Sequence, residues 1–558
     1  MIIDTRNSNF FVNEDIKDLY NSFYLNSKQT FKDQIAAFFR KQEQDIFTNL
    51  SLTQFGHPKY TNIYKDYCIL LTLNEYDSKL VGPIKIIIDS YLLALVLKEI
   101  KFRNQVKIVY KPKNIKYLEE LRNFFKKTFF FIKKIYQVIL VKALVERLEI
   151  RKENVLYEVF LSNRASHERY YGNLKDFLNA KQKKDTVFLP ILIDTQFGDL
   201  LSLISSFRKS SENWLFREHY LGIKEIFYAV FYKSRLKRKL HLNVPQNSYE
   251  VFFHHSFVRE LFSSLISEGI LNYFFLKNIK KVNKNNFPNI FIDWWENSPM
   301  DKGMFLGTNH FFKEIEHKAF LGIYPNLNSL QFIAPSKEER ENSCAPKKIL
   351  VIGNYLINFL ASNFTNAEIV VSPSFRGPFL QKTEQMPTDN KILVILPIFT
   401  KSSINIIQLL KSSFPALGEK IIFRLHPASD IEKLTNEIIK SNFLHNNIDS
   451  SRNLETLIKS ADTIICGESS VIIQALMMSK RVVVVNDDPF NPINMTDTHF
   501  ESCTYLNLDI EKNRTALVEV LATSPSIVQL KPSNKENFFF MEPTQQNVNN
   551  ILLGRDNN

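Results

Sequence analysis

The sequence predicts an α/β protein built from two Rossmann-like units that face each other across a cleft. Short apolar runs alternate with segments of helical period through residues 346–525. A polar and charged stretch, 334–343, separates this region from similar runs earlier in the chain. Open parallel sheets bind ligands at the carboxyl ends of their strands, so a cleft between two such edges is the expected place for a site.

Residues 346–525 show the alternation of strands and helices most clearly. We expect buried parallel strands at 348–352, 367–371, 391–396, 420–425, 462–466 and 481–485. Apolar residues at helical spacing between these runs predict helices at 402–413, 431–440, 453–459 and 469–478. The order is that of a doubly wound sheet, and we assign 346–525 to a Rossmann-like domain.

Residues 1–335 are expected to form an α/β domain with helical insertions near 115–150 and 200–240. Expected strands are 84–88, 106–110, 186–193, 289–292 and 319–323, and expected helices are 91–101, 251–275 and 299–314. Ser298 and Pro299 suit the cap and first position of the last helix. The tail, 526–558, is expected to pack back on this first domain.

Composition limits the class of protein and its location. Hydrophobic residues make up 44% and charged residues 23% of the 558 positions, which excludes a disordered or fibrous chain. Four scattered cysteines are too few for a disulfide scaffold or a zinc site. The longest apolar run, 91–97, is too short to span a membrane, and the first residues lack the order of a signal peptide. We therefore expect a cytoplasmic protein.

The net charge of +13 favours anionic partners. Basic residues mix with bulky apolar ones at 124–134 and 227–239. Such a mixture suits docking on the anionic cytoplasmic face of the inner membrane, where lipid-linked acceptors reside, and it equally suits a solvated helix face over ordinary core aromatics. The hypothesis of a nucleic-acid-binding protein rests on the charge alone, because no nucleic-acid-binding motif is present. We therefore expect no nucleic-acid partner.

The first candidate motif follows the predicted strand 420–425 and includes Arg424, His426 and Pro427. A histidine at a strand end can donate a hydrogen bond to a phosphate oxygen, and Pro427 stiffens the turn and offers an apolar face to a base or ribose. A purely structural histidine at a strand end is the alternative.

The second candidate motif is Gly467-Glu468-Ser469-Ser470, between a predicted strand and a predicted helix. Gly467 permits a tight turn, and the serine hydroxyls and backbone N–H groups at a helix start suit a phosphate. A plain helix cap by Ser469 is the alternative. Because both motifs follow strands of one sheet, we expect them to bind one nucleotide.

The third candidate motif, Asp293-Trp294-Trp295-Glu296-Asn297, follows the predicted strand 289–292 of the first domain. Its carboxylates are expected to face the cleft from the side opposite the nucleotide, or else to be solvated acids at a helix start. Trp295, as a wall against a sugar ring, Asn297 and Arg376 are the expected substrate contacts.

The histidine–proline and serine–serine pair resembles the nucleotide-binding half of GT-B glycosyltransferases, particularly bacterial sialyltransferases and Kdo transferases. This resemblance implies that His426, Pro427, Ser469 and Ser470 bind the CMP of the donor and that 346–525 is the nucleotide-sugar-binding domain. It also implies that 1–335 is the acceptor-side domain, with Glu296 or Asp293 as the catalytic carboxylate. The motif around Asp293 departs from the usual acidic motif of those sialyltransferases. Over 280–510, including the segment around Arg376, the chain is also similar to surface carbohydrate biosynthesis proteins.

The resemblance implies transfer of Kdo or another ulosonic acid from its CMP donor to a surface glycan such as lipopolysaccharide or capsule. A carboxylate would act as general base or nucleophile, and His426, the serines and Arg376 or Arg424 would stabilise the leaving phosphate. We expect no metal site and no cofactor beyond the nucleotide sugar. Because Arg424–Pro427 also looks like the motif of teichoic-acid glycerophosphotransferases, a CDP-polyol enzyme stays open, as does a non-catalytic carbohydrate-assembly protein.

Overall fold

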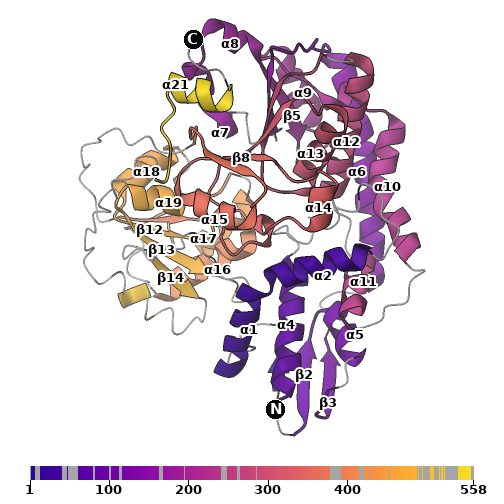
Figure 1. Ribbon diagram of the computed structural model, residues 1–558. Helices are drawn as coiled ribbons and strands as arrows, with labels where there is room; N and C mark the ends of the chain where they lie inside the picture. Colours follow the sequence, from indigo (N-terminus) through magenta and orange to yellow (C-terminus); the bar gives the residue numbers. More distant parts are fainter. Residues whose placement is uncertain are drawn as a thin grey trace.

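The computed structural model shows three parallel sheets (Figure 1). It describes residues 2–6, 10, 13–40, 47, 61–79, 82–99, 102–111, 116–161, 168–193, 195–240, 248–259, 264–283, 286–376, 391–413, 420–427, 429–449, 451–486, 488, 490, 493, 495, 503–507, 515, 517–519, 521 and 538–554. No helix within these ranges has both the length and the apolar character needed to cross a bilayer.

The first sheet has three strands in the order β1-β2-β3, namely β1 (Ile2–Asp4), β2 (Ile84–Ile88) and β3 (Val106–Tyr110). Its helices are α1 (Glu14–Asn26), α2 (Lys28–Arg40), α4 (Thr61–Asp77) and α5 (Tyr91–Glu99). The predicted strands 84–88 and 106–110 are confirmed. The sequence did not predict β1, nor that these strands form a sheet of their own.

The second sheet has six strands in the order β5-β4-β6-β7-β8-β9. They are β4 (Val155–Leu161), β5 (Thr186–Leu192), β6 (Ile290–Trp294), β7 (Glu316–Leu321), β8 (Lys348–Val351) and β9 (Glu368–Val371). All but the edge strand β9 are short, largely buried apolar runs, as expected of a parallel sheet covered on both faces. Strand β4 was not predicted.

The change from one sheet to the next falls later in the chain than the sequence predicts. Strands β8 and β9 belong to the predicted 346–525 domain, but β8 pairs with β7 and β9 pairs with β8. The polar stretch before them is not a free linker. It forms the capped helix α14 (Lys337–Glu341), in which Glu339 is fully buried. The next sheet starts only at residue 392.

The third sheet has five strands in the order β11-β10-β12-β13-β14. They are β10 (Ile392–Ile395), β11 (Ile421–Arg424), β12 (Thr463–Cys466), β13 (Arg481–Asn486) and β14 (Cys503–Asn507). The helices are α16 (Thr400–Ser413), α17 (Ile431–Lys440), α18 (Leu454–Ser460) and α19 (Val471–Met477). The predicted doubly wound alternation is thus confirmed from β10 to β13.

Both larger sheets reverse their strand order at one point. In the five-stranded sheet the reversal lies between β10 and β12, and in the six-stranded sheet between β4 and β6. Chain crossovers leave these points in opposite directions, which opens a crevice outside the carboxyl ends of the two strands. These edges are therefore where the fold favours ligand sites.

The helical insertions lie mainly around the six-stranded sheet. The predicted helix 251–275 is instead two helices, α11 (Ser248–Arg259) and α12 (Ser264–Asn283), and α13 (Pro299–Phe311) starts at the predicted Ser298 cap. The remaining elements are α6 (Lys116–Leu144), α7 (Glu168–Tyr171), η3 (Leu174–Phe177), α8 (Ala180–Asp185), α9 (Leu200–Arg208), η4 (Arg217–Tyr220), α10 (Ile223–Leu240), η5 (Leu330–Phe332), α15 (Tyr355–Asn363), η7 (His445–Asn447), α21 (Gln545–Asn547) and η8 (Val548–Leu552).

The end of the chain returns to the six-stranded sheet, where α21 lies near α7 and α8 (Figure 1). The backbone N–H of Met541 donates to the carbonyl of Ile352 at 2.7 Å, and Lys318 Nζ donates to the carbonyl of Leu552 at 2.9 Å. The described part of the tail thus becomes part of the first Rossmann-like unit.

The three-stranded unit contacts both larger sheets. Tyr20 of α1 donates its hydroxyl to the carbonyl of Phe490, in the segment after β13, at 2.8 Å. Lys32 of α2 pairs with Glu339 of α14 at 2.9 Å, and Lys302 of α13 lies 3.4 Å from the same carboxylate. Glu339 therefore joins the N-terminal unit to the six-stranded unit through buried charges.

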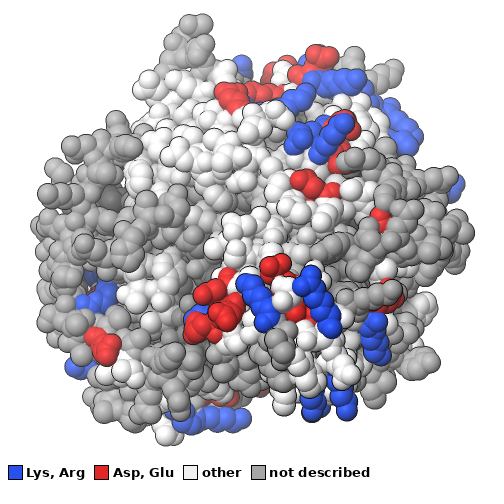
Figure 2. Space-filling model, turned by 60° about the horizontal axis from the view of Figure 1, so that its bottom comes forward, with Lys and Arg blue, Asp and Glu red and all other residues white. Residues whose placement is uncertain are grey.

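The positive net charge is not gathered into one area on the face drawn in Figure 2. Among the described residues on that face, blue and red side chains lie interspersed, with white areas between them. The described residues of this face therefore form no single large patch of one sign.

Candidate functional site

The histidine–proline motif lies directly after β11. Ser429 donates both its backbone N–H and its hydroxyl to the carbonyl of His426, at 3.0 and 2.7 Å, which closes a tight turn. His426 is half-buried and Pro427 is exposed. The turn thus presents both side chains at the carboxyl edge of the five-stranded sheet.

The serine–serine motif lies directly after β12. A Cβ on Gly467 would come within 3.2 Å of Pro397 Cγ, so the absence of a side chain lets this loop lie against the loop after β10. Ser469 accepts a hydrogen bond from the backbone N–H of Val471 at 3.3 Å and so caps α19, as the alternative interpretation expected. Both serines remain half-buried, and Glu468 is exposed.

The strand register brings these two loops to one edge. Arg424, the last residue of β11, and Cys466, the last residue of β12, both lie level with Ile395 of β10. Neighbouring strands are about 4.8 Å apart, so the two strand ends are separated by roughly 10 Å. The loops leave on either side of β10, and the serine loop stands at the reversal of strand order. This arrangement fits one ligand that spans both loops.

The predicted Arg424 binds backbone beside this edge. Arg424 Nη1 donates to the carbonyl of Asp449 at 3.0 Å. Burial would raise the pKa of the Asp449 carboxyl, but hydrogen bonds from Arg452 and Ser451 outweigh it and lower this pKa to about 2. The turn that receives Arg424 is therefore held by a stable carboxylate.

Arg376 connects the two larger sheets. Its guanidinium carbon lies 5.6 Å from the ring centre of Trp294, at the end of β6. Its carbonyl accepts a hydrogen bond from Gln474 of α19 at 3.3 Å. Arg376 thus joins the helix that follows the serine loop to the segment that carries Trp294 and Glu296.

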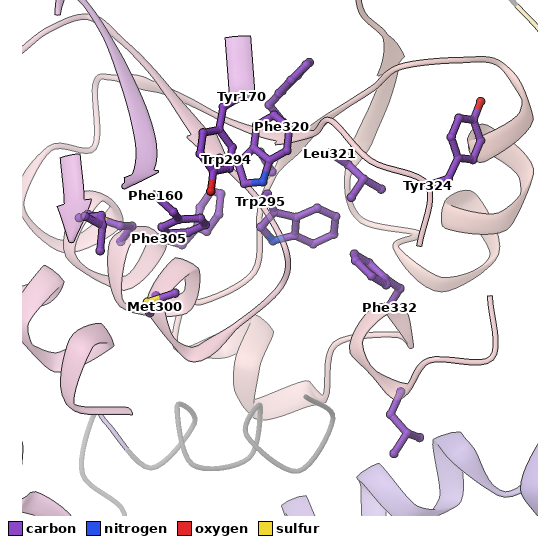
Figure 3. Packing of buried hydrophobic residues seen from close by; sticks show 14 of the residues in the cluster. Phe160, Tyr170, Trp294, Trp295, Met300, Phe305, Phe320, Leu321, Tyr324 and Phe332 are labelled. Atoms are coloured by element: carbon purple, nitrogen blue, oxygen red, sulfur yellow. The ribbon is translucent and has the colours of Figure 1, made fainter. Parts of the chain in front are cut away.

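Both tryptophans of the third motif are core residues. Trp294 is 1% exposed and packs edge-on against Tyr170, and Trp295 is fully buried against Phe332 and Phe364 (Figure 3). The prediction that Trp295 forms a wall against a sugar ring is therefore wrong for this structure. Burying two indoles stabilises the sheet edge, and neither ring is exposed to a ligand.

The two predicted acids differ in exposure. Glu296 is half-buried and accepts a hydrogen bond from Trp294 Nε1 at 3.3 Å. Its neighbour Asn297 adopts a positive φ of 52° and donates its side-chain amide to the carbonyl of Gln331. Asp293 is fully buried, which contradicts the expectation that both carboxylates face the cleft.

Three titratable residues near Asp293 were missed by the sequence analysis: Glu158, Asp301 and His317. One carboxylate oxygen from each of Glu158, Asp293 and Asp301 lies within 4.8 Å of the others. Burial, together with the charge of Asp293, raises the pKa of Glu158 and of Asp301 well above its ordinary value. A carboxylate inside the apolar run Val155–Leu161 was the available signal, because an acid on a buried strand is rare without a partner.

Solved structures with a similar fold include UDP-GlcNAc 2-epimerases. That of Methanocaldococcus jannaschii is 13% identical, with a TM-score of 0.41 over 72% of this chain and 100% of that chain. That of Neisseria meningitidis is 12% identical, with a TM-score of 0.38 over the same shares. A trehalose 6-phosphate synthase of Burkholderia multivorans is 9% identical, with a TM-score of 0.38 over 68% of this chain and 90% of that chain. The fold of this chain is α/β, and its two larger parallel sheets have a Rossmann-like strand order.

No curated protein matches the sequence. Residues 128–483 match the model of the alpha-2,8-polysialyltransferase family, a span of more than half of the chain that runs from α6 to β13 and includes all three candidate motifs. The chain belongs to the alpha-2,8-polysialyltransferase family and is a glycosyltransferase.

Proposed function

We propose that this protein transfers a nonulosonic acid of the sialic acid type from its CMP-linked donor to a bacterial surface glycan, without the help of an organic cofactor. The family description favours such a sugar over Kdo. The observation that carries the proposal is the register of β11, β10 and β12, which puts the His426 and Ser469 loops on one sheet edge. A CMP-sugar reaches across such a distance, because its phosphate lies between two rings.

In this proposal the five-stranded sheet binds the nucleotide. The imidazole of His426 and the hydroxyl of Ser470 bind the phosphate, and Pro427 packs against the ribose or base. Hydrogen-bond donors that are fixed before the reaction stabilise the charge of the departing phosphate at little reorganisation cost. Arg424 ends β11 at this edge, and Arg376 lies beside α19 and Trp294; both add positive charge.

The acceptor is bound from the six-stranded sheet, with Glu296 as the catalytic carboxylate. Of the two acids predicted from the sequence, Glu296 alone reaches the surface. Its backbone N–H donates to Asp301 Oδ2 at 2.9 Å, and its carbonyl accepts from Gln331, so the residue is fixed from both sides. A fixed carboxylate can remove the proton of an acceptor hydroxyl as the sugar develops oxocarbenium character.

We further propose that α6 docks on the anionic cytoplasmic face of the membrane. Residues Leu121, Phe125, Ile132 and Ile139 are 51–60% exposed and fall within about 40° of one another around the helix. The exposed apolar stripe is continued by Phe124 and Phe129, and by Ile223 and Phe227 of the adjacent α10. The exposed side chains of Arg122 and Lys126 flank it, and such a basic, apolar face matches an anionic lipid surface. The four free, buried cysteines suit a reducing compartment.

A donor panel tests the proposed reaction. Purified protein is offered CMP-linked sialic acid, CMP-Kdo, UDP-GlcNAc and CDP-glycerol, each with a surface glycan acceptor, and the released nucleotide is measured. We expect CMP release from CMP-linked sialic acid only. Turnover of CDP-glycerol instead would support the glycerophosphotransferase alternative, and binding of CMP without turnover of any donor would support a non-catalytic assembly protein.

A further inference from the structure

The buried acids Glu158, Asp293 and Asp301 meet at the reversal point of the six-stranded sheet. The register pairs Tyr157 of β4 with Ile292 of β6, so the next residues, Glu158 and Asp293, lie side by side across the two strands. Asp301 enters from the first turn of α13. All three side chains are fully buried.

The oxygens that face one another in this cluster have no hydrogen-bond partner among the described residues. They are both carboxylate oxygens of Glu158, both of Asp293, and Oδ1 of Asp301. Asp301 Oδ2 is used differently, because it accepts the backbone N–H groups of Ser298 and Glu296 at 2.8 and 2.9 Å. Burying three unpaired carboxylates is costly, so the cluster calls for a counter-charge.

A fourth buried group points into the cluster. The His317 side chain is 5% exposed, and its Nε2 lies 3.6 Å from Asp293 Oδ2. The imidazole is held between the rings of Phe291 and Phe305, at 4.4 and 3.9 Å between centres. Neither ring nitrogen has a hydrogen-bond partner among the described residues. This fixed, otherwise unpartnered imidazole is an independent sign that Asp293 belongs to a built site.

Neighbouring cations are already engaged by other acids. The positive charge of Arg217 lowers the pKa of Glu158, but the Arg217 guanidinium is hydrogen-bonded to Glu268 and Asn272. Lys302, the residue after Asp301, lies 3.4 Å from the carboxylate of Glu339. Neither side chain forms an ion pair with the cluster.

We propose that Glu158, Asp293 and Asp301 together bind one divalent cation that prefers oxygen ligands, such as Mg²⁺ or Mn²⁺. Such ions bind oxygens at about 2.1–2.5 Å, so pairs of ligand oxygens stand roughly 3–5 Å apart, in agreement with the 4.8 Å limit of the cluster. His317 is a positioning residue, whose imidazole Nε2 lies 3.6 Å from Asp293 Oδ2. The cation replaces the sequence-based expectation that the chain has no metal site.

A bound cation would fix the loop that carries the proposed catalytic acid. The cluster joins β4, β6 and the start of α13, and Asp301 also holds the backbone of Glu296. The site is independent of the nucleotide loops, which lie on the other sheet. A failure of the donor panel and a failure of the cation site are therefore separate results.

Mn²⁺ uptake tests the site without any need for activity. Tag-free full-length protein is stripped with a chelator and titrated with Mn²⁺, and free Mn²⁺ is followed by its electron paramagnetic resonance signal. We expect one bound ion per chain and a rise in the unfolding temperature with added Mn²⁺. No uptake by the folded wild-type protein would overturn the proposal and leave protons shared among the carboxyl groups as the counter-charge.

Isosteric variants locate the ion. Glu158→Gln and Asp293→Asn should each weaken Mn²⁺ binding more than tenfold and abolish the thermal response. Asp66→Asn is the matched control, because Asp66 is also a buried carboxylate but is bonded to Ser90 in the three-stranded unit, and it should bind Mn²⁺ as the wild type does. Equal binding by all variants would show that the ion sits elsewhere. If a cluster variant does not fold, Mn²⁺ uptake by the wild-type protein still decides whether an ion binds.

Discussion

Asp293 and Glu296 lie three residues apart and have different surroundings. Asp293 faces Glu158 and His317 in the interior, whereas Glu296 lies beyond the end of β6 and reaches the surface. In a strand, successive side chains alternate between faces, and past its end the backbone is free to turn outward. Position relative to the strand end therefore separates a residue that shapes the site from one that can act on a substrate.

Glu296→Gln should leave CMP binding unchanged and lower kcat by roughly 10²–10⁴-fold, the usual contribution of a general base. Glutamine keeps the size of the side chain but cannot accept the proton. The comparison variant is Glu432→Gln, on the exposed face of α17. Full activity of the Glu296 variant would remove this residue from the mechanism.

Glu339 gives a prediction about pH. Burial would raise the pKa of its carboxyl, but the charges of Lys302 and Lys32 outweigh burial and bring the pKa well below its ordinary value. A lowered folded-state pKa contributes stability above the unfolded pKa, near 4.3, and this contribution is lost as the pH falls below it. Urea unfolding at a series of pH values should therefore show wild-type stability falling below about pH 4.5.

Glu339→Gln should be less stable than the wild type by about 3–5 kcal/mol at pH 7, because it leaves two buried lysines without their partner. Its stability should also depend less on pH between about 2 and 5. The exposed pair of Lys337 and Glu341 offers a control, since Glu341→Gln should change stability by less than about 1 kcal/mol. Parallel pH profiles for wild type and Glu339→Gln would contradict this account of the contact.

At the scale of elements, the strands could be predicted from the sequence, but the sheet to which each strand belongs could not. The runs that became β8 to β13 were recognised from apolar length and the helices between them. An apolar run does not encode which neighbour it pairs with, so β8 and β9 were assigned to the wrong sheet. The same limit explains Trp295, because a position just after a strand does not tell whether an indole turns inward.

Helix α6 carries the prediction on membrane contact. Phe124→Ser with Phe125→Ser should reduce sedimentation with vesicles that contain anionic lipid several-fold, because it removes two exposed rings from the apolar stripe. Vesicles of neutral lipid should bind the wild type weakly, and added salt should lower binding to anionic vesicles. Ile439→Ser, an exposed apolar residue on α17, is the control. Equal sedimentation of the wild type with neutral and anionic vesicles would contradict a basic docking face.

At the scale of the whole molecule, the two larger sheets are linked at the edges where ligands are expected. Arg376 contacts Trp294 at the end of β6 and receives Gln474 of α19. The N-terminal unit adds Tyr20, which binds the segment after β13. The sequence predicted two facing units from alternation alone, whereas these contacts join residues far apart in the chain and could not be predicted from local pattern.

Calorimetric titration with CMP tests the central claim that the loops after β11 and β12 form one nucleotide site. The wild type should bind CMP more tightly than UMP, and His426→Ala and Ser470→Ala should each weaken CMP binding by roughly tenfold, the loss of about one charge-assisted hydrogen bond. His445→Ala, an exposed histidine on the same sheet unit, should bind CMP like the wild type. CMP binding that is unchanged in both loop variants would contradict the claim.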